Sequence, residues 1–323
     1  MMRRKRLGMI STFVWDTIYG RDPRSEPVTE WGGCAYALSA LDASLADDWE
    51  IVPLVKVGDD LAARAREFIA TLSHVAPDAA LIGVPYPNNR VELRYETSER
   101  RAEKLTGGLP GWSWLGLKPL LRDLDALYIN FMSGWELDLE TCQLIRQSFS
   151  GPIYCDLHMK VHAVQPDGWR VLQPLPNIDQ WCRCFDLLQM NEDEVTTVAH
   201  DPMELAATAM MAGVRCLTVT LGSKGAVYFA APGFDALADL RKAPSAIDVG
   251  PLRTALVPVP AMLDTGDPTG CGDVWGATYF SRLLAGDDIA AAMRAAHGAA
   301  ARNVMFRGAS GLTRHLRGEL ITQ

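Results

Sequence analysis

The sequence lacks the features that mark several classes of protein. No run of about 18 apolar residues, the length of a membrane span, occurs in its 323 residues. Basic residues are not in excess, because 31 Lys and Arg stand against 39 Asp and Glu, for a net charge of −8. This balance argues against binding to a nucleic-acid backbone. Internal repeats and low-complexity tracts are also missing. We therefore expect neither a membrane protein nor a nucleic-acid-binding protein.

The cysteines show no pattern of disulfides or of zinc ligands. Seven are scattered along the chain, no CxxC pair occurs, and Cys182-x-Cys184 has no second half at zinc-binding spacing. The basic start of the chain resembles the first part of a secretion signal, but polar residues interrupt the apolar stretch behind it and no cleavage pattern follows. We predict reduced thiols in a cytoplasmic protein.

What is present is the composition of a soluble globular protein, with 48% apolar and 22% charged residues. Short apolar segments alternate with helical patterns, an order typical of βαβ units and a parallel sheet. The expected strands are 7–15, 51–57, 79–84, 126–131, 153–156, 187–190 and 217–220, and the expected helices include 139–149, 203–212, 271–284 and 289–305. We predict an α/β fold, a Rossmann-like αβα sandwich with a mostly parallel central sheet, in a single domain over residues 1–323.

Two segments depart from this pattern. Residues 17–31 form a polar, proline-containing excursion behind the first strand, and residues 88–103 contain a stretch in which Val91, Leu93 and Tyr95 share one side. Such alternation leaves one face of a strand in water, whereas the other expected strands are apolar on both faces. The sequence therefore predicts a small β-sheet lid formed by about 17–31 and 88–103. Its apolar stripe suggests that two copies pair through the lid as a homodimer.

The strongest local signal is the stretch Asp264-Thr-Gly-Asp-Pro-Thr-Gly-Cys-Gly-Asp273, which leads directly into a helical pattern. Gly270 and Gly272 permit close backbone approach, and the unpaired amides at a helix N-terminus attract an anion. Asp273 places a carboxylate beside that anion, where it can take a proton from a hydroxyl. An arbitrary Gly-x-Gly-Asp is more often a helix cap with a tight turn. The local pattern alone leaves both interpretations open.

Other nucleotide-binding motifs do not fit. The segment Gly270-Cys-Gly272-Asp-Val-Trp-Gly276 is one residue too long for the dinucleotide fingerprint and falls late in the chain, and no GxxxxGK[ST] occurs. A nicotinamide dehydrogenase needs an early G-x-G-x-x-G, whereas the first strand here leads into Asp16-Thr-Ile-Tyr. A P-loop enzyme is therefore excluded, and a dehydrogenase is disfavoured.

The segment Asp267-Pro-Thr-Gly-Cys-Gly-Asp273 resembles the Asp-Thr-Thr-Gly-Ala-Gly-Asp signature of the ribokinase-like (PfkB) carbohydrate kinases. Other segments agree with that family in the same order. They are Gly32-Gly33, Gly58-Asp59-Asp60, Asn191-Glu-Asp-Glu194, Thr220-Leu-Gly-Ser-Lys-Gly225 and Arg307-Gly308-Ala309. The resemblance spans roughly residues 7 to 310 and depends on all the motifs together, since each is weak alone.

The resemblance implies a phosphotransferase that uses ATP and Mg²⁺ to phosphorylate a hydroxyl of a sugar or a related small molecule. Asp273 would be the general base, and the amides of Gly270, Cys271 and Gly272 would hold the transferred phosphoryl group. The other corresponding residues are Asp16, Gly32 and Gly33 for the acceptor, Thr220, Gly222, Gly225 and His297 for the nucleotide, and Asn191 and Glu194 for magnesium. The sequence does not decide whether a monovalent cation activates the enzyme.

Ordinary structural roles compete with several of these assignments. Asn191 can cap a helix, Gly222 and Gly225 can make a plain hairpin turn, and His297 can be a packing residue. Arginines at the predicted lid, which are Arg90, Arg94, Arg100 and Arg101, can clasp an anionic substrate or form a solvated face paired with neighbouring glutamates. For these arginines the solvated face is the favoured interpretation.

The chain also departs from the family pattern. Ala37 stands where the family usually has an Asn that contacts the substrate, and Pro268 and Cys271 replace the usual Thr and Ala of the signature. The acceptor therefore stays open. Two alternatives remain: a nucleoside kinase of the same family, and a kinase-like sensor that binds sugar or nucleotide and turns over weakly.

Overall fold

The computed structural model describes residues 3–20, 24, 26–79, 81–95, 101–241, 251–260 and 266–319. In this part of the chain, twelve strands form one sheet. They are β1 (Lys5–Tyr19), β2 (Val28–Gly33), β3 (Trp49–Gly58), β4 (Ile82–Val84), β5 (Asn89–Tyr95), β6 (Arg101–Thr106), β7 (Ala126–Asn130), β8 (Ile153–Asp156), β11 (Leu187–Asn191), β12 (Cys216–Thr220), β13 (Ala226–Ala230) and β14 (Arg253–Val257).

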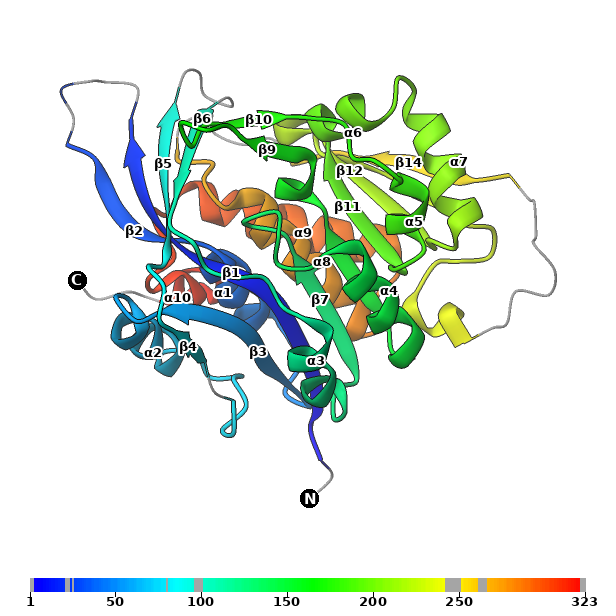
Figure 1. Ribbon diagram of the computed structural model, residues 1–323. Helices are drawn as coiled ribbons and strands as arrows, with labels where there is room; N and C mark the ends of the chain where they lie inside the picture. Colours follow the sequence, from blue (N-terminus) through cyan, green and yellow to red (C-terminus); the bar gives the residue numbers. More distant parts are fainter. Residues whose placement is uncertain are drawn as a thin grey trace.

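The central part of the sheet has the order β14-β13-β12-β11-β8-β7-β1-β3-β4 (Figure 1). From β12 to β4 all neighbours in this order run parallel, and β13 is antiparallel to both of its neighbours. All five residues of β7 and all four of β8 are buried, as expected for parallel strands that are covered on both faces. The predicted α/β fold with a mostly parallel sheet is confirmed.

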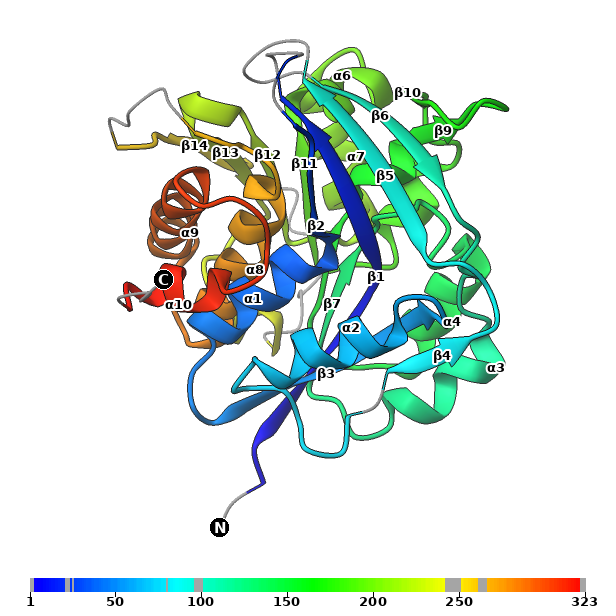
Figure 2. The ribbon, with the colours of Figure 1, turned by 90° about the vertical axis from the view of Figure 1, so that its left-hand side faces the viewer.

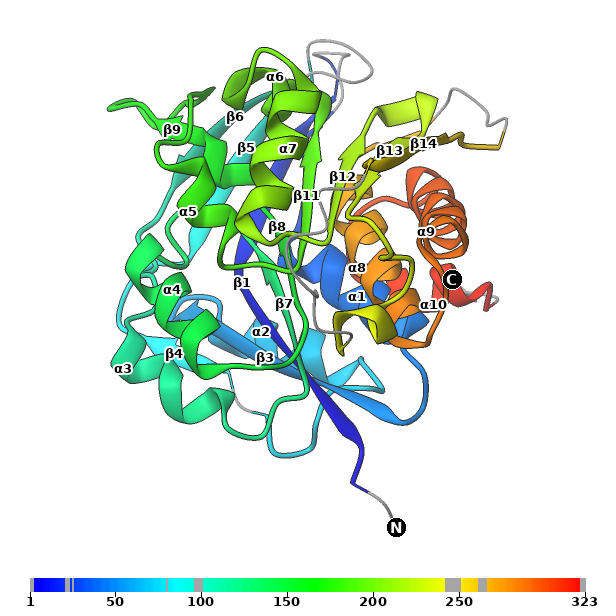
Figure 3. The ribbon, with the colours of Figure 1, turned by 90° about the vertical axis from the view of Figure 1, so that its right-hand side faces the viewer.

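Helices cover both faces of this sheet, as Figures 2 and 3 show from opposite sides. One face carries α1 (Cys34–Ser44), α2 (Ala62–Ala70), α8 (Cys271–Leu284), α9 (Ile289–Val304) and α10 (Leu312–Arg317). The other carries α3 (Trp114–Leu117), α4 (Leu139–Ser148), α5 (Ile178–Cys182), α6 (Glu192–Val198) and α7 (Pro202–Ala212). Each face has its own hydrophobic core. Among the described residues, no helix is both long and apolar enough to cross a membrane.

The long strand β1 belongs to two parts of the sheet. Its first half, Lys5–Thr12, pairs with β3, and its second half pairs with β2 on one side and with β5 on the other. β6 then pairs with β5. We call β2, β5, β6 and the second half of β1 the small sheet. It projects from the main body beyond the end of the central strands (Figures 1 and 2).

The stripe on β5 is not offered to a second copy of the chain. Val91 and Leu93 are each 3% exposed and belong to a hydrophobic cluster with residues of β1 and β6. The hydroxyl of Tyr95 lies 2.6 Å from that of Thr269, within hydrogen-bonding distance. Because the alternation buries this stripe inside the chain, it gives no argument for a homodimer. The sequence showed which side of the strand is apolar, but not what covers that side.

A short hairpin that the sequence did not predict lies beside the small sheet. β9 (His162–Val164) and β10 (Arg170–Leu172) pair antiparallel, and the Leu105 amide of β6 donates to the Gly168 carbonyl of the connecting turn at 2.8 Å. Figure 1 shows this hairpin next to β6. It brings Arg170 to the pocket described below. Four 3₁₀ turns complete the described elements: η1 (Lys118–Leu121), η2 (His158–Val161), η3 (Gly222–Lys224) and η4 (Leu237–Arg241).

Candidate active site

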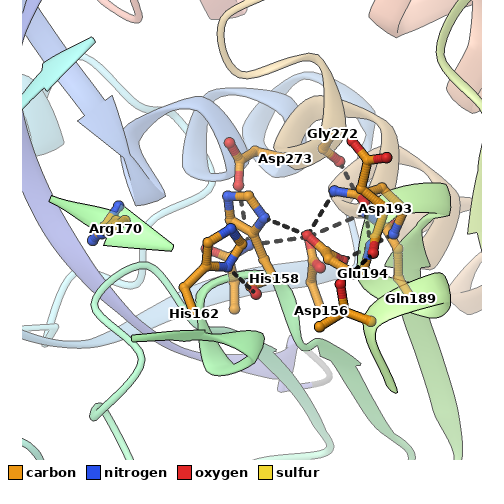
Figure 4. A network of polar contacts seen from close by, with 12 residues as sticks. Asp156, His158, His162, Arg170, Gln189, Asp193, Glu194, Gly272 and Asp273 are labelled. Carbon is orange, nitrogen blue, oxygen red and sulfur yellow. Dashed lines mark hydrogen bonds and ion pairs between the residues drawn. The ribbon is translucent and has the colours of Figure 1, made fainter. Parts of the chain in front are cut away.

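Polar side chains converge where the central strands end, beside the N-terminus of α8 (Figure 4). Asn130 ends β7 and Asp156 ends β8, while Gln189 lies near the end of β11. The Gln189 amide nitrogen donates to Asp156 Oδ2 at 3.1 Å and to the Gly272 carbonyl at 3.3 Å, so it joins the sheet to α8. Ligands of open parallel sheets bind outside the carboxyl ends of the strands, which is where this network lies.

The Asp273 carboxylate accepts a side-chain hydrogen bond through one of its two oxygens. Its Oδ1 accepts a hydrogen bond from Asn130 Nδ2 at 3.0 Å, and Asn130 Oδ1 in turn accepts from the Ser11 hydroxyl at 3.0 Å. Burial raises the pKa of Asp273, and the His158 charge, the Asn130 bond and the Arg101 charge counteract that rise in part. The carboxylate is thus fixed in position and lines a pocket, with a basicity above that of an ordinary aspartate.

The N-terminus of α8 leaves backbone donors facing that carboxylate. Gly270 has φ of 74°, and a Cβ there would collide with the ring of Tyr36, so this turn requires glycine. At Gly272 an added Cβ would meet nothing within 4 Å, so the backbone faces open space. The Cys271 amide donates to the Pro268 carbonyl at 3.1 Å. Three amides were predicted to form the anion hole. Among the described residues, the amides of Gly270 and Gly272 have no hydrogen-bond acceptor, whereas the Cys271 amide has one.

The turn before α8 is fixed by contacts from distant elements. Asn303 of α9 donates to the Thr269 carbonyl at 2.8 Å, and the Asp267 amide donates to the Val304 carbonyl at 2.9 Å. Asp267 Oδ1 accepts from the Thr269 amide at 2.9 Å. Asp264, at the start of the predicted signature, lies outside the described residues. The part from Gly266 to Asp273 is thus a rigid turn held by α9 and by its own carboxylate.

Asn191 and Glu194 form a capping box at the start of α6. The Glu194 amide donates to Asn191 Oδ1, and the Asn191 amide donates to Glu194 Oε2, each at 2.9 Å. Glu194 is 1% exposed, and its Oε1 also accepts from Asn191 Nδ2 at 2.6 Å. The alternative structural role of Asn191 as a helix cap is therefore present in the structure. It places a buried carboxylate at the same edge of the sheet as Asp156.

His158 occupies the space between Glu194 and Asp273 (Figure 4). Its Nδ1 lies 2.9 Å from Glu194 Oε1. Burial lowers the pKa of His158, but the hydrogen bond and charge of Glu194, with the charges of Asp156 and Asp273, outweigh burial and raise the pKa to about 9. Its φ of 25° is unusual for a residue other than glycine and marks local strain. A cation thus already lies among three carboxylates.

The acceptor residues predicted from the sequence lie in a pocket between the small sheet and α8. The pocket has a cavity volume of about 40 Å³ and opens to solvent, and Asp16, Gly33, Gly270 and Asp273 line it. Burial raises the pKa of Asp16 to about 7, although Arg101 and Arg170 oppose that rise. A Cβ at position 32 would collide with the Asp16 carboxylate, which explains Gly32. Asp16 and Asp273 therefore face one cavity.

The predicted nucleotide residues are divided between two places. Thr220 pairs in register with Asn191, so the turn that follows β12 lies beside the capping box. Gly222 and Gly225 have φ of 57° and 109°, and a Cβ at Gly225 would collide with the Val257 carbonyl, so a hairpin turn alone requires that glycine. His297 is 2% exposed, and its Nδ1 accepts from the Trp275 indole at 3.0 Å.

His297 Nε2 lies 2.9 Å from the Val257 carbonyl oxygen, so both ring nitrogens have partners inside the chain. The structure therefore places His297 in the packing between α8, α9 and β14. It does not place His297 in the polar network around Asp273. This is the packing role that the sequence left open as its alternative.

The arginines at the predicted lid have different surroundings. Arg90 forms an ion pair with Asp60 at 2.7 Å and Arg94 with Glu92 at 3.1 Å, both at the surface. Arg101, in contrast, lines the pocket and bonds to Glu103. Arg100 lies outside the described residues. The interpretation as a solvated face therefore describes Arg90 and Arg94, and it is wrong for Arg101.

Several residues of the site were missed from the sequence. Arg170 and Glu103 line the pocket but belong to short strands with no pattern of their own, and no local signal could have found them. For His158 a signal was present, because Asp156-x-His158 directly follows an apolar strand. Tyr36, which lines the pocket from α1, follows the diglycine by only three residues.

The chain can now be compared with known proteins. Residues 162–314 match the model of the family described as pfkB family carbohydrate kinase. No curated protein matches the sequence.

Solved structures with the same fold cover nearly the whole chain. A pyrophosphate-dependent kinase of the ribokinase family, solved with a pyrophosphate analogue and myo-inositol, is 16% identical, with a TM-score of 0.71, over 94% of this chain and 96% of the other. A nucleoside kinase from Burkholderia thailandensis, with inosine, is 16% identical (TM-score 0.69, 95% and 94%).

An Arabidopsis thaliana ribokinase with ribose and ATP is also 16% identical (TM-score 0.66, 98% of each chain). Identities this low show a shared fold, and the family model adds the signature region to it. Residues 162–314 therefore match the pfkB family of carbohydrate kinases, and the chain as a whole has the fold of the ribokinase-like kinases.

Proposed function

We propose that this protein transfers a phosphoryl group to a hydroxyl of a sugar or a closely related small molecule, with Asp273 as the general base. The observation that carries the proposal is the position of Asp273 in the pocket, beside the open backbone at Gly272 and across from Asp16. A base, an anion-binding helix end and a second carboxylate thus face one cavity. These are the parts that hydroxyl phosphorylation needs.

In the proposed reaction, Asp273 takes the proton of the acceptor hydroxyl as its oxygen attacks the terminal phosphorus of the donor. The bond from that phosphorus to the donor's bridging oxygen breaks, and the shortened donor leaves. The Gly270 and Gly272 amides and the α8 dipole would stabilise the charge on the transferred group. General-base assistance contributes about 10²–10⁴ in rate, and burial raises the pKa of Asp273, which makes its carboxylate a stronger base.

ATP is the proposed donor, with its phosphates at the N-terminus of α8 and its nucleoside toward Thr220, Gly222 and Gly225. The open backbone at Gly272 gives phosphate oxygens room to approach. Pyrophosphate is the alternative donor, because one structure with this fold is described as pyrophosphate-dependent. His297 has no part in the proposal, since both of its nitrogens are used inside the chain.

The side chains of the site could hold Mg²⁺ only together with water and with the phosphates of the donor. In the described part of the chain, no group of three or more His, Cys, Asp or Glu side chains is arranged to hold a metal. The oxygens of Glu194 already accept hydrogen bonds from Asn191 and His158. We propose that Asn191 and Glu194 organise Mg²⁺ through water while donor phosphates supply the remaining oxygens, the ligand set that Mg²⁺ prefers. The bound ion would neutralise charge on the donor.

The small sheet is proposed to act as a lid over the acceptor, within a single domain that spans residues 1–323. Val91 and Leu93 line the pocket from β5, and Asp16 lines it from the strand that joins the small sheet to the body. Closure would exclude water from the reacting groups. Pairing of two copies through this sheet stays a prediction, which sedimentation at micromolar concentration would test. A cytoplasmic location and a nucleoside as acceptor are likewise predictions.

A screen of acceptors tests the proposal. Pentoses, hexoses, sugar phosphates, sugar acids, polyols and nucleosides are offered with Mg²⁺ and either ATP or pyrophosphate, and release of ADP or phosphate is measured beside Asp273→Asn. We expect one class of acceptor to give turnover that Asp273→Asn abolishes. If donor and acceptor bind but no acceptor is phosphorylated, the protein is the sensor instead.

A further inference from the structure

The end of the pocket near Asp16 is built by three charged residues that no family motif identifies. Glu103 of β6 accepts from Arg101 Nε at 2.8 Å through Oε1 and from Arg170 at 2.8 Å through Oε2. All three side chains line the pocket. We call this group the Arg101–Glu103–Arg170 triad. Two guanidinium groups therefore share a single carboxylate at the wall of the cavity.

Arg170 is buried and incompletely paired. Its side chain is 4% exposed, and besides the Glu103 contact one terminal nitrogen donates to the Met132 carbonyl at 2.7 Å. Its Nε is buried and has no hydrogen-bond partner among the described residues. A buried donor left without an acceptor is costly, and structures usually supply one. Because Arg170 lines the pocket, a bound anion can lie beside its guanidinium group.

The triad carries one positive charge in excess. The charges of Arg101 and Arg170 outweigh burial and hold the pKa of Glu103 well below its usual range, so this carboxyl stays ionised between them. Asp16, which lines the same pocket, has a pKa raised to about 7 by burial and is partly protonated at neutral pH. It therefore neutralises that excess only in part.

The surroundings of the triad strengthen this charge. Val14, Val91, Leu93 and Met132 form the apolar part of the pocket wall. In such a low-dielectric environment an unbalanced cation attracts an anion more strongly than it does in water. Arginine is also the side chain whose planar fork matches the oxygens of a carboxylate or a phosphate. His158 and Asp273 line the same pocket, and the hydroxyl would react at Asp273.

We propose that the acceptor carries an oxyanion, a carboxylate or a phosphate group, that binds Arg101 and Arg170 while its hydroxyl faces Asp273. The inference rests on the proposed phosphotransfer and narrows its substrates to sugar acids, sugar phosphates and similar hydroxylated anions. A neutral sugar would leave the excess positive charge of the triad without a counterpart. The triad thus selects for charge, and Asp16 selects for hydroxyls.

Matched pairs of probes test this inference without a donor. D-gluconate is compared with D-glucitol, and D-ribose 5-phosphate with D-ribose, by titration calorimetry on the full chain. We expect at least one anion to bind about ten to a hundred times more tightly than its neutral partner, as charge-assisted bonds to arginine imply. The first pair reports on a carboxylate and the second on a phosphate. If neither anion binds more tightly than its neutral partner, the inference is overturned.

Substitutions in the triad then show which residues cause the preference for an anionic ligand. Arg170→Gln is expected to reduce the preference for the anion at least tenfold while binding of the neutral partner changes little. Arg101→Gln, at a more exposed side chain of the triad, gives a second reading should Arg170→Gln fail to fold. The matched control is Arg253→Gln, which breaks a surface ion pair with Asp235 and should leave all affinities unchanged. A preference that survives in both triad variants would place the anion elsewhere, for example at the N-terminus of α8.

Turnover separates this inference from the proposed function. Phosphorylation of a neutral acceptor that requires Asp273, with no preference for anions, would overturn the inference and keep the kinase. Tight binding of an anion that depends on Arg170, without phosphorylation by either donor, would keep the inference and overturn the proposed kinase activity.

Discussion

The two halves of the proposed site, which we call the donor half and the acceptor half, hold their charged groups in different ways. In the donor half, at the ends of β11 and β12, Glu194 is bonded to Asn191 only three residues away. In the acceptor half, Arg170 is bonded to Glu103 across 67 residues of sequence, and the two belong to different small elements. One half is built by a local motif, and the other is assembled when separate strands dock.

This difference separates the groups proposed to carry out phosphoryl transfer from those proposed to select the substrate. A capping box forms wherever its helix forms, so the donor half depends little on the rest of the pocket. The acceptor half exists only while the β9–β10 hairpin lies beside β6, which pairs with β5 next to the second half of β1. We infer that the groups for transfer are preformed and that the choice of substrate depends on how the small sheet docks.

Gly270 is the position where a change breaks both halves at once. Gly270→Ala forces a left-handed φ of 74° on alanine and pushes a methyl group into Tyr36. We expect turnover to fall more than about a hundredfold, as misplaced catalytic groups cause, and stability to drop by about 1–3 kcal/mol. Turnover and urea unfolding are the measurements.

The control for Gly270→Ala is Gly298→Ala on α9, where an added Cβ meets nothing within 4 Å. It should keep its activity and gain up to about 1 kcal/mol from helix propensity. Equal effects of the two substitutions would show that the turn does not depend on the geometry of Gly270.

The donor half is tested by Glu194→Gln. The change keeps the shape of the side chain but removes the charge that holds the pKa of His158 at about 9. The Mg²⁺ concentration for half-maximal rate should rise about tenfold if the carboxylate organises the ion, and the pKa of His158, followed by NMR, should fall. Glu192→Gln, at an exposed residue that pairs with Lys224 at 3.5 Å, is the control and should change neither. An unchanged Mg²⁺ titration in Glu194→Gln would remove this residue from the donor half.

The acceptor half is tested by how the stability of the protein depends on pH through the titration of Asp16. Burial raises its pKa from 3.8 to about 7 in the folded chain, so the folded state binds a proton that the unfolded state has lost. The stabilisation is complete below the unfolded pKa and disappears as pH rises through about 7.

Between pH 5 and pH 8.5, unfolding by urea should therefore show a loss of roughly 2–4 kcal/mol that Asp16→Asn largely removes. Other buried carboxyls contribute to the slope in both proteins, and the difference between the two isolates Asp16. Identical slopes would show that Asp16 keeps an ordinary pKa.

The same contrast explains what the sequence could predict. Asp273, Gly270 and the pair Asn191 and Glu194 lie within short motifs whose geometry is set by neighbouring residues. Their places could be inferred because each motif lies at the end of an expected strand or at the start of an expected helix. The mostly parallel sheet followed from continuous apolar runs, which the burial of β7 and β8 explains.

In the acceptor half, Asp16, Gly32 and Gly33 were inferred from motifs, but the Arg101–Glu103–Arg170 triad could not be inferred in this way. Arg170 lies on a strand of three residues, too short for any periodicity, and its role depends on the docking of that hairpin against β6. Alternation on β5 identified an apolar side but not its cover, which is the chain's own cluster. Arg101 was grouped with Arg90 and Arg94 because sequence spacing does not show which arginine turns inward.

The most direct test of the central claim compares two neighbouring buried carboxylates, Asp273 and Asp156. Asp156 accepts a hydrogen bond from Gln189 Nε2 at 3.1 Å and is not among the residues that line the pocket, whereas Asp273 lines it, so only Asp273 is placed to act on the acceptor hydroxyl. Single-turnover rates are measured at saturating donor and acceptor in Asp273→Asn and Asp156→Asn. We predict a loss of about a thousandfold or more in Asp273→Asn and less than about tenfold in Asp156→Asn. Equal losses, or a near-normal rate in Asp273→Asn, would contradict the account.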